Sequence, residues 1–227
     1  EIWCDQVKDF IEQVIRPKNS RKVILIGNSL GALVALTCAV SLEEQIETVI
    51  ASPLPDQFQE NKKIIINKAL FKNLKNRFIT IFFLFFPLEI ILFLVIKLGI
   101  IRLGLNYAYF KKNNIDSELI DLVTKPVLRR TAARSLRAMC IGMSSRDEKL
   151  QASYLLKKLS ASKKVPFLLI WGDKDNFIPL FLGKKIAFFH TWLKLKIVSN
   201  LGHCIHDEDP SVFNRISYEW IRDLKTF

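Results

Sequence analysis

A short apolar strand that runs into a glycine-flanked serine and then into a helix is the feature that most constrains the fold. Residues 22–27, KVILIG, are apolar and β-branched, which is typical of a strand buried on both faces of a sheet. Residues 29–40 have a helical composition, and residues 46–52, IETVIAS, form a second buried strand. The alternation predicts an α/β fold with a parallel sheet, a right-handed crossover and the first run as an interior strand.

The rest of the chain continues the alternation of strands and helices, interrupted by one long segment with a helical pattern. Residues 2–15 have apolar side chains at spacings of three and four, which predicts an amphipathic helix ended by Pro17. Further strands are expected at 165–173 and 195–200, and helices at 180–193 and 211–224. The intervening stretch is helical in pattern. We therefore expect a core of residues 1–52 and 165–227, with a mostly helical insertion at 53–164.

Charge and cysteine content narrow the classes of protein and partner. Half of the 227 residues are apolar, enough for one sizeable core, and the net charge is +12. Residues 61–112 contain ten Lys or Arg and one acidic residue, Glu89, so 10 − 1 = +9 of the excess lies there. The four cysteines form no C-x-x-C pair, which disfavours a zinc knuckle or disulfide scaffold and indicates a reducing compartment. No signal-peptide pattern follows Glu1.

The pentapeptide GNSLG, residues 27–31, carries the clearest chemical signal. It fits G-x-S-x-G at a strand-to-helix turn, where Gly27 and Gly31 let strand and helix approach and Ser29 projects its hydroxyl. The helix N-terminus favours developing negative charge. A glycine-bearing turn with an incidental serine is the alternative. The setting favours Ser29 as a nucleophile.

A serine hydroxyl needs a base, and the chain offers three histidines. His203 follows a strand and a glycine, at the sheet edge where Ser29 is expected. His206 lies in the same loop and could instead cap the last helix, whereas His190 sits among aromatic residues in a helix. The loop also contains Cys204 and Asp207. These possible metal ligands are crowded into one short loop, which disfavours a metal site.

The imidazole in turn needs a carboxylate, and more than one position can provide it. Asp173 and Asp175 follow the third strand in WGDKDNFIP, and both are also ordinary turn residues. Asp56 follows the second strand, and its spacing does not exclude it. The residues by themselves leave the choice open.

Three motifs in order, GNSLGA, WGDKDNFIP and GHCIHDEDPSVFN, resemble the α/β-hydrolase superfamily. The residues of the last motif are most similar to those of hydrolases from cyanobacteria and plastids, the pheophytinase-like group. In this chain Ile205 replaces the proline that is usual in that group. The segment 101–123 resembles the cap of those proteins. The resemblance implies an α/β-hydrolase fold with a helical cap insertion, Asp175 as the acid and His203 as the base.

The resemblance also implies an oxyanion hole with two backbone donors. Leu30, after the serine, can supply one N–H group. The other comes from a loop that precedes the opening helix in the family, so we expect that the early strands and this loop are missing from the chain. No G-x-G-x-x-G is present, and we expect neither a cofactor nor a metal.

The apolar run at 78–96 has sixteen Leu, Ile, Phe or Val in nineteen positions, with basic residues on both sides. We expect a buried or lipid-touching cap, with a membrane span as the alternative, because the run lies between strands of one domain. The basic flanks would suit an anionic membrane surface. A second basic stripe, at Arg129, Arg130, Arg134 and Arg137, favours a solvated helix face, and no nucleic-acid motif accompanies it.

These observations predict a serine hydrolase that cleaves a carboxylic ester with a bulky or long apolar group. A hydrophobic cap favours such a substrate, and pheophytin-like esters follow from the resemblance alone. The alternative is a membrane-associated, non-catalytic α/β-hydrolase-like binding protein. We expect a cytoplasmic or plastid stromal location, peripheral to a membrane, and no nucleic-acid partner.

Overall fold

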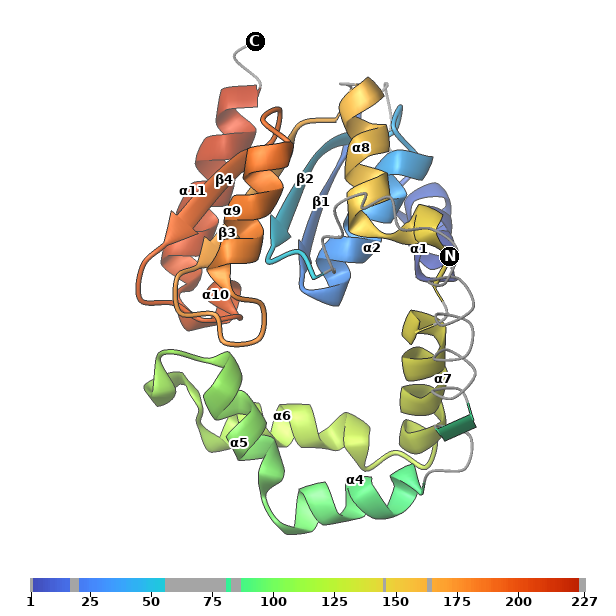
Figure 1. The fold of residues 1–227 in the computed structure, drawn as a ribbon, viewed down its shortest axis with the longest axis vertical. Coiled ribbons are helices and arrows are strands. Elements are labelled where there is room, and N and C mark those ends of the chain that lie inside the picture. The colour runs from blue at the N-terminus through green and yellow to red at the C-terminus, as the bar shows by residue number, and fades with distance from the viewer. Residues whose placement is uncertain are drawn as a thin grey trace, which may run out of the picture. The chain divides into compact units, whose positions relative to one another are not determined.

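The chain folds into two compact units, each described here by itself (Figure 1). The computed structural model describes residues 2–16, 21–55, 81–82, 87–144, 146–162 and 165–224. Unit 1 comprises residues 1–58, 107–112 and 149–227, and unit 2 comprises residues 59–106 and 113–148. The sheet belongs to unit 1.

Four parallel strands form the sheet of unit 1, in the order β1 (Val23–Asn28), β2 (Ile46–Ser52), β3 (Phe167–Gly172) and β4 (Lys194–Val198). Crossover helices join neighbouring strands, with α2 (Leu30–Ser41) between β1 and β2 and α9 (Leu180–Phe189) between β3 and β4. The predicted α/β fold with a parallel sheet is confirmed. Because all four strands run the same way, their carboxyl ends gather at one edge.

Side chains of the central strands alternate between two cores, as the period of two residues requires. Val49, Phe167 and Leu169 face a core shared with α2, α9 and α8 (Ala152–Ser162). Ile50, Leu168 and Ile170 face α11 (Pro210–Leu224), which covers the other side. In Figure 1, α11 and α2 accordingly lie on opposite faces of the sheet. The buried strands predicted at 46–52 and 165–173 are confirmed by β2 and β3.

The prediction that β1 is an interior strand buried on both faces differs from the structure. Among the described strands, β1 pairs with β2 alone, and its side chains are partly exposed. Val23 and Leu25 pack against the α2 side. Ile26 points to the other face, is not among the residues that pack in the cluster under α11, and is 52% exposed.

The opening helix is less buried than its pattern predicted. It consists of α1 (Ile2–Phe10) and a π-helical turn, Ile11–Ile15, which ends at Arg16 in the left-handed conformation with φ 43°. Pro17, the predicted terminator, lies outside the described residues. A π turn has a different period from an α-helix, so the apolar stripe is not continued. Cys4 and Ile11 are buried, whereas Phe10 is exposed.

The described part of unit 2 consists of helices and turns. Its helices are α4 (Leu88–Lys97), most of α5 (Ile100–Ala108), α6 (Ser117–Val127) and α7 (Ala132–Ser144). Asp116 caps α6 by accepting from the Leu119 N–H at 2.8 Å. Glu89 of α4 pairs with Arg137 of α7 at 3.3 Å. Arg137, predicted to be solvated, thus has an ion-pair partner.

The boundaries of unit 2 differ from the predicted insertion range 53–164 in three places. Residues 53–58 belong to unit 1. Residues 149–164 belong to unit 1, because α8 buries Leu155, Leu156 and Leu159 against the α2 side of the sheet. Residues 107–112 also belong to unit 1, although unit 2 flanks them on both sides.

The apolar run at 78–96 is only partly described, since residues 78–80 and 83–86 lie outside the described ranges. Its best-defined part is α4, a helix of ten residues. Within the described ranges, no helix has both the length and the apolarity that crossing a bilayer requires.

Candidate active site

Ser29 occupies the junction between β1 and α2 in a backbone conformation that non-glycine residues seldom adopt, with φ 51° and ψ −118°. Its N–H donates to the Ser52 carbonyl at 3.1 Å, and its carbonyl accepts from the Ala32 N–H at 2.9 Å. Such backbone strain costs about 1–3 kcal/mol and is concentrated at functional sites. The strain at Ser29 therefore agrees with the turn that the G-x-S-x-G pattern predicts.

The two glycines around Ser29 have different roles. A Cβ atom at Gly27 would lie 2.3 Å from the Gly31 carbonyl oxygen and 2.6 Å from the Ala32 nitrogen. A side chain at Gly27 would thus force β1 and α2 apart. A Cβ atom at Gly31 would meet nothing within 4 Å. The steric argument made from the sequence holds at Gly27, and Gly31 contributes its backbone.

His203 and Asp175 form a buried pair at the carboxyl edge of the sheet. His203 Nδ1 lies 3.0 Å from Asp175 Oδ2, and the Asp175 side chain is fully buried. The other oxygen, Oδ1, accepts from the N–H groups of Phe177 and Ile178, at 2.8 Å each. These bonds fix the carboxylate. With Nδ1 donating to it, Nε2 is left as the atom that can accept a proton.

Asn28 connects the serine turn to the histidine loop. Its Nδ2 donates to the His203 carbonyl at 3.1 Å and also to the Ser52 carbonyl at the end of β2. The residue directly before Ser29 is thus bonded to the backbone of His203, 175 positions away. Sequence reasoning missed Asn28. The only available signal was its place inside G-x-S-x-G.

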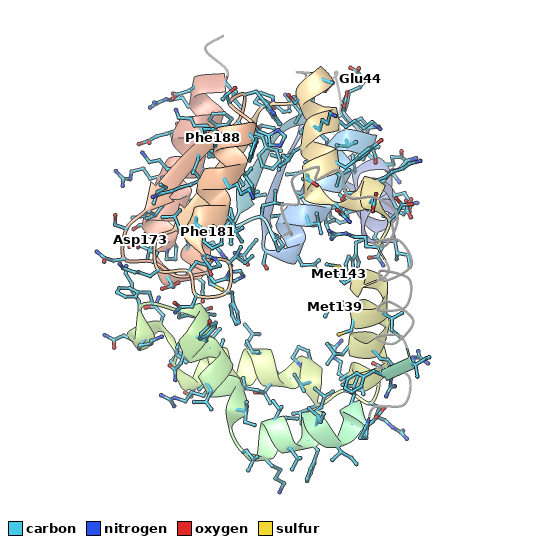
Figure 2. All side chains as sticks on the ribbon, viewed as in Figure 1. Glu44, Met139, Met143, Asp173, Phe181 and Phe188 are labelled. Atoms are coloured by element: carbon cyan, nitrogen blue, oxygen red, sulfur yellow. The ribbon has the colours of Figure 1, made fainter. Side chains whose placement is uncertain are left out.

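The alternative acids are placed differently from Asp175. Asp173 lies in the turn after β3 (Figure 2), where its Oδ1 accepts from the Asn200 N–H at 2.7 Å and its Oδ2 lies 3.7 Å from Lys174 Nζ. It therefore braces the turn after β4. Asp56 lies outside the described residues.

The other two histidines pack among aromatic rings. The His206 ring is edge-to-face with Phe213, at 6.0 Å between centroids. His190 follows α9, where its Nδ1 lies 3.4 Å from Trp192 Nε1. Burial lowers the pKa of both imidazoles. Within the described residues, no group of three or more His, Cys, Asp or Glu side chains is arranged to hold a metal ion.

An exposed aromatic pair adjoins His203 within unit 1. The Phe177 ring lies edge-to-face with the His203 ring at 5.3 Å and with the Tyr107 ring at 5.1 Å. Asn176 Nδ2 donates to the Tyr107 carbonyl at 3.3 Å. Both rings remain about half exposed. Neither residue stands out as a site residue in the sequence, because Tyr107 precedes Phe177 by seventy positions.

A parallel sheet with a strained serine after one strand, an acid after another and a histidine after the last defines the class of α/β-hydrolases. The sequence model of the alpha/beta hydrolase family matches residues 3–216. The chain therefore belongs to this family.

The chain is also similar to two curated proteins. The chain is 24% identical over 205 residues to an uncharacterized hydrolase, YugF, of Bacillus subtilis, covering 89% of this chain and 66% of the relative. It is 26% identical over 240 residues to the chloroplastic pheophytinase of Arabidopsis thaliana, covering 100% of this chain and 46% of the relative. The chain thus spans between about half and two thirds of the length of these relatives.

Solved structures share the fold. A meta-cleavage product hydrolase from Pseudomonas fluorescens matches with a TM-score of 0.67 and 15% identity, over 98% of this chain and 71% of the other. A thermophilic esterase from Thermogutta terrifontis matches with a TM-score of 0.65 and 17% identity, over 97% of this chain and 71% of the other. At these identities the matches establish the fold and nothing more.

Proposed function

We propose that the protein is a serine hydrolase that cleaves a carboxylic ester. One observation carries the proposal: a strained Ser29 whose neighbour Asn28 is hydrogen-bonded to His203, which is in turn paired with a buried Asp175. Nucleophile, acid and base follow one another in the chain order of the family. The names of the relatives, among them hydrolases and an esterase, support the same reaction class.

The proposed acylation step uses these three residues. Ser29 Oγ attacks the ester carbonyl carbon while His203 Nε2 takes its proton, and Asp175 stabilises the imidazolium that forms. The negative charge develops on the carbonyl oxygen. Leu30 is the first residue of α2, where N–H groups lack a carbonyl partner in the helix, so its N–H is the proposed oxyanion donor.

The remaining steps restore the enzyme. The C–O bond to the leaving group breaks, and the alcohol takes the proton from His203, which leaves an acyl group on Ser29. His203 then takes a proton from water, the resulting hydroxide attacks the acyl carbon, and the carboxylic acid is released as Ser29 regains its proton. No cofactor or metal enters this scheme.

The aromatic pair supports an ester with a bulky or long apolar group. Phe177 exposes ring surface beside the imidazole that would take the serine proton, and Tyr107 extends this surface from Phe177. Covering such surface with an apolar group is favourable, by about 25 cal/mol for each Å² removed from water. Pheophytin-like esters are suggested only by the relative named a pheophytinase.

Covalent labelling tests the reaction class. A fluorophosphonate reacts with a serine that a neighbouring base activates, so we expect one adduct on the native protein, located by mass spectrometry on the peptide that contains Ser29. Heat-denatured protein is the control, because its serines lack the base. If native Ser29 stays unmodified, the non-catalytic binding protein is the better description.

We further propose that α4 and the beginning of α5 dock on an anionic membrane surface, with the protein peripheral to the cytoplasmic or stromal side. Six large apolar side chains are exposed there, beside the charged residues Glu89, Lys97 and Arg102: Ile90, Phe93, Leu94, Leu98, Ile100 and Leu103. Lys97 lies over the Phe93 ring at 5.7 Å, and Arg102 follows on α5. Each basic side chain near such a surface contributes about 1 kcal/mol and is screened by salt.

Flotation with liposomes tests this docking surface. We expect the protein to float with phosphatidylglycerol vesicles at low salt, and to be released by high salt or carbonate. Phe93→Asp combined with Leu103→Asp should abolish flotation, whereas Leu122→Asp on α6, which also replaces an exposed leucine, should not. Equal behaviour of all three proteins would contradict docking through α4 and α5. Resistance to carbonate would favour a membrane span.

A further inference from the structure

Glu208 is a buried carboxylate that the proposed reaction does not use. It lies in α10 (Ile205–Glu208), five positions after His203, and is 3% exposed. Its Oε1 accepts from the Gly202 N–H at 2.8 Å. Its Oε2 accepts from the N–H groups of Phe110 and Lys111, at 2.8 and 2.9 Å. A charged acceptor in such a place strengthens each of these bonds.

These bonds join two distant segments directly at the histidine. Gly202 precedes His203, and the His203 N–H donates to the Ala108 carbonyl at 2.8 Å. A Cβ atom at Gly202 would lie 2.3 Å from the Ala108 carbonyl oxygen and 2.8 Å from Glu208 Oε1. Only glycine lets the backbones come this close. The glycine before the catalytic histidine therefore has a structural reason in residues 108–111.

The carboxylates on either side of Glu208, those of Asp207 and Asp209, also bind side chains of residues 109–111. The Tyr109 hydroxyl donates to Asp207 Oδ2 at 2.5 Å, and burial raises the pKa of Tyr109, so the hydroxyl keeps its proton. Lys111 Nζ lies 2.7 Å from Asp209 Oδ2 and lowers the pKa of Asp209 to about 2. The residues HDED, 206–209, thus include three successive acids that all bind residues 109–111.

We propose that Glu208 is a positioning residue for His203, which it holds in place through the N–H of Gly202 and through residues 108–111. The inference rests on the proposed function, since it assigns His203 as the base. A carboxylate is needed because both of its oxygens accept from N–H groups. An amide has one oxygen, and its NH₂ group would face backbone donors on the other side. The imidazole ring would then shift with the backbone that carries it.

The test measures the turnover of a chromogenic ester by the wild-type protein and by the variants Glu208→Gln and Asp207→Asn. Fluorophosphonate titration counts the active sites in each preparation. Displacing a catalytic group by about 1 Å can cost about 100-fold in rate, so we expect kcat for each titrated site to fall about 10- to 100-fold in Glu208→Gln, with KM nearly unchanged. Asp207→Asn is the matched control, because an amide oxygen still accepts from the Tyr109 hydroxyl. Its kcat should stay within about threefold of wild type.

A purely structural Glu208 would lower the melting temperature and the number of titrated sites, and leave kcat for each site and its pH profile as in wild type. That result would overturn the proposal. If Glu208→Gln does not fold, Gly202→Ala addresses the same contact from the other side, and an unchanged kcat per site there would also overturn it. Absent labelling and turnover in the wild-type protein would instead refute the serine hydrolase itself.

Discussion

Ser29→Ala should reduce turnover of a chromogenic ester by about six powers of ten, as loss of the nucleophilic serine does in subtilisin. The methyl group cannot attack the carbonyl, so acyl transfer has no route through this residue. Folding should be unaffected. Alanine keeps the Cβ atom, so it experiences the same backbone strain at φ 51° as the serine does.

Steady-state kinetics and circular dichroism of the full chain measure the two effects separately. Ser41→Ala is the control, because Ser41 lies at the end of the same helix and donates to the Thr37 carbonyl. It should leave the rate within about twofold of wild type, since the change is exposed and far from the turn. Acyl transfer that persists in Ser29→Ala would refute Ser29 as the nucleophile.

Asp175→Asn should lower kcat by about 10⁴. The reason lies in the two N–H groups that donate to Oδ1, from Phe177 and Ile178. They require an oxygen at that position, so the amide nitrogen of asparagine must take the place of Oδ2, facing His203 Nδ1. The nitrogen then donates to Nδ1, the ring proton moves to Nε2, and the imidazole can no longer accept the serine proton.

Asp173→Asn is the matched control for this change. Asp173 Oδ1 accepts from the Asn200 N–H, and the amide oxygen of an asparagine can still accept this bond. The position opposite His203 Nδ1 is held by Asp175 and not by Asp173. We expect kcat within about threefold of wild type. A large loss in Asp173→Asn with none in Asp175→Asn would move the acid to Asp173. If neither variant lost activity, Asp56 would become the acid to test.

Most of the sheet region could be predicted from the sequence because its signals are local. Buried parallel strands are short apolar runs, and the serine turn has glycines at fixed spacing around Ser29. The partial exposure of β1 could not be predicted, because an apolar run does not show whether its strand lies inside the sheet or at its edge, where β1 stands among the described strands. Likewise, the sequence of α8 does not show whether its apolar residues pack in unit 1 or in unit 2.

The site could be predicted only as far as its motifs extend. Asp175 and His203 were selected over Asp173 and His206 by resemblance, and the structure pairs the selected two. Asn28 and Glu208 could not be found, because each bonds to backbone groups about 100 or more positions away. Backbone partners leave no side-chain pattern in the sequence, so contacts of this kind become visible only when the chain is folded.

The return of residues 107–112 to unit 1 changes how the insertion can be exchanged or altered. An insertion with two ends could be swapped between hydrolases by cutting at both. Here the helical region has four junctions, near residues 58, 106, 112 and 148, and the short piece between the inner two belongs with the sheet. A graft that replaces the whole of 59–148 would therefore remove the backbone on which the histidine loop rests, whereas a chimera that exchanges 59–106 and 113–148 together and keeps residues 107–112 would leave that backbone in place.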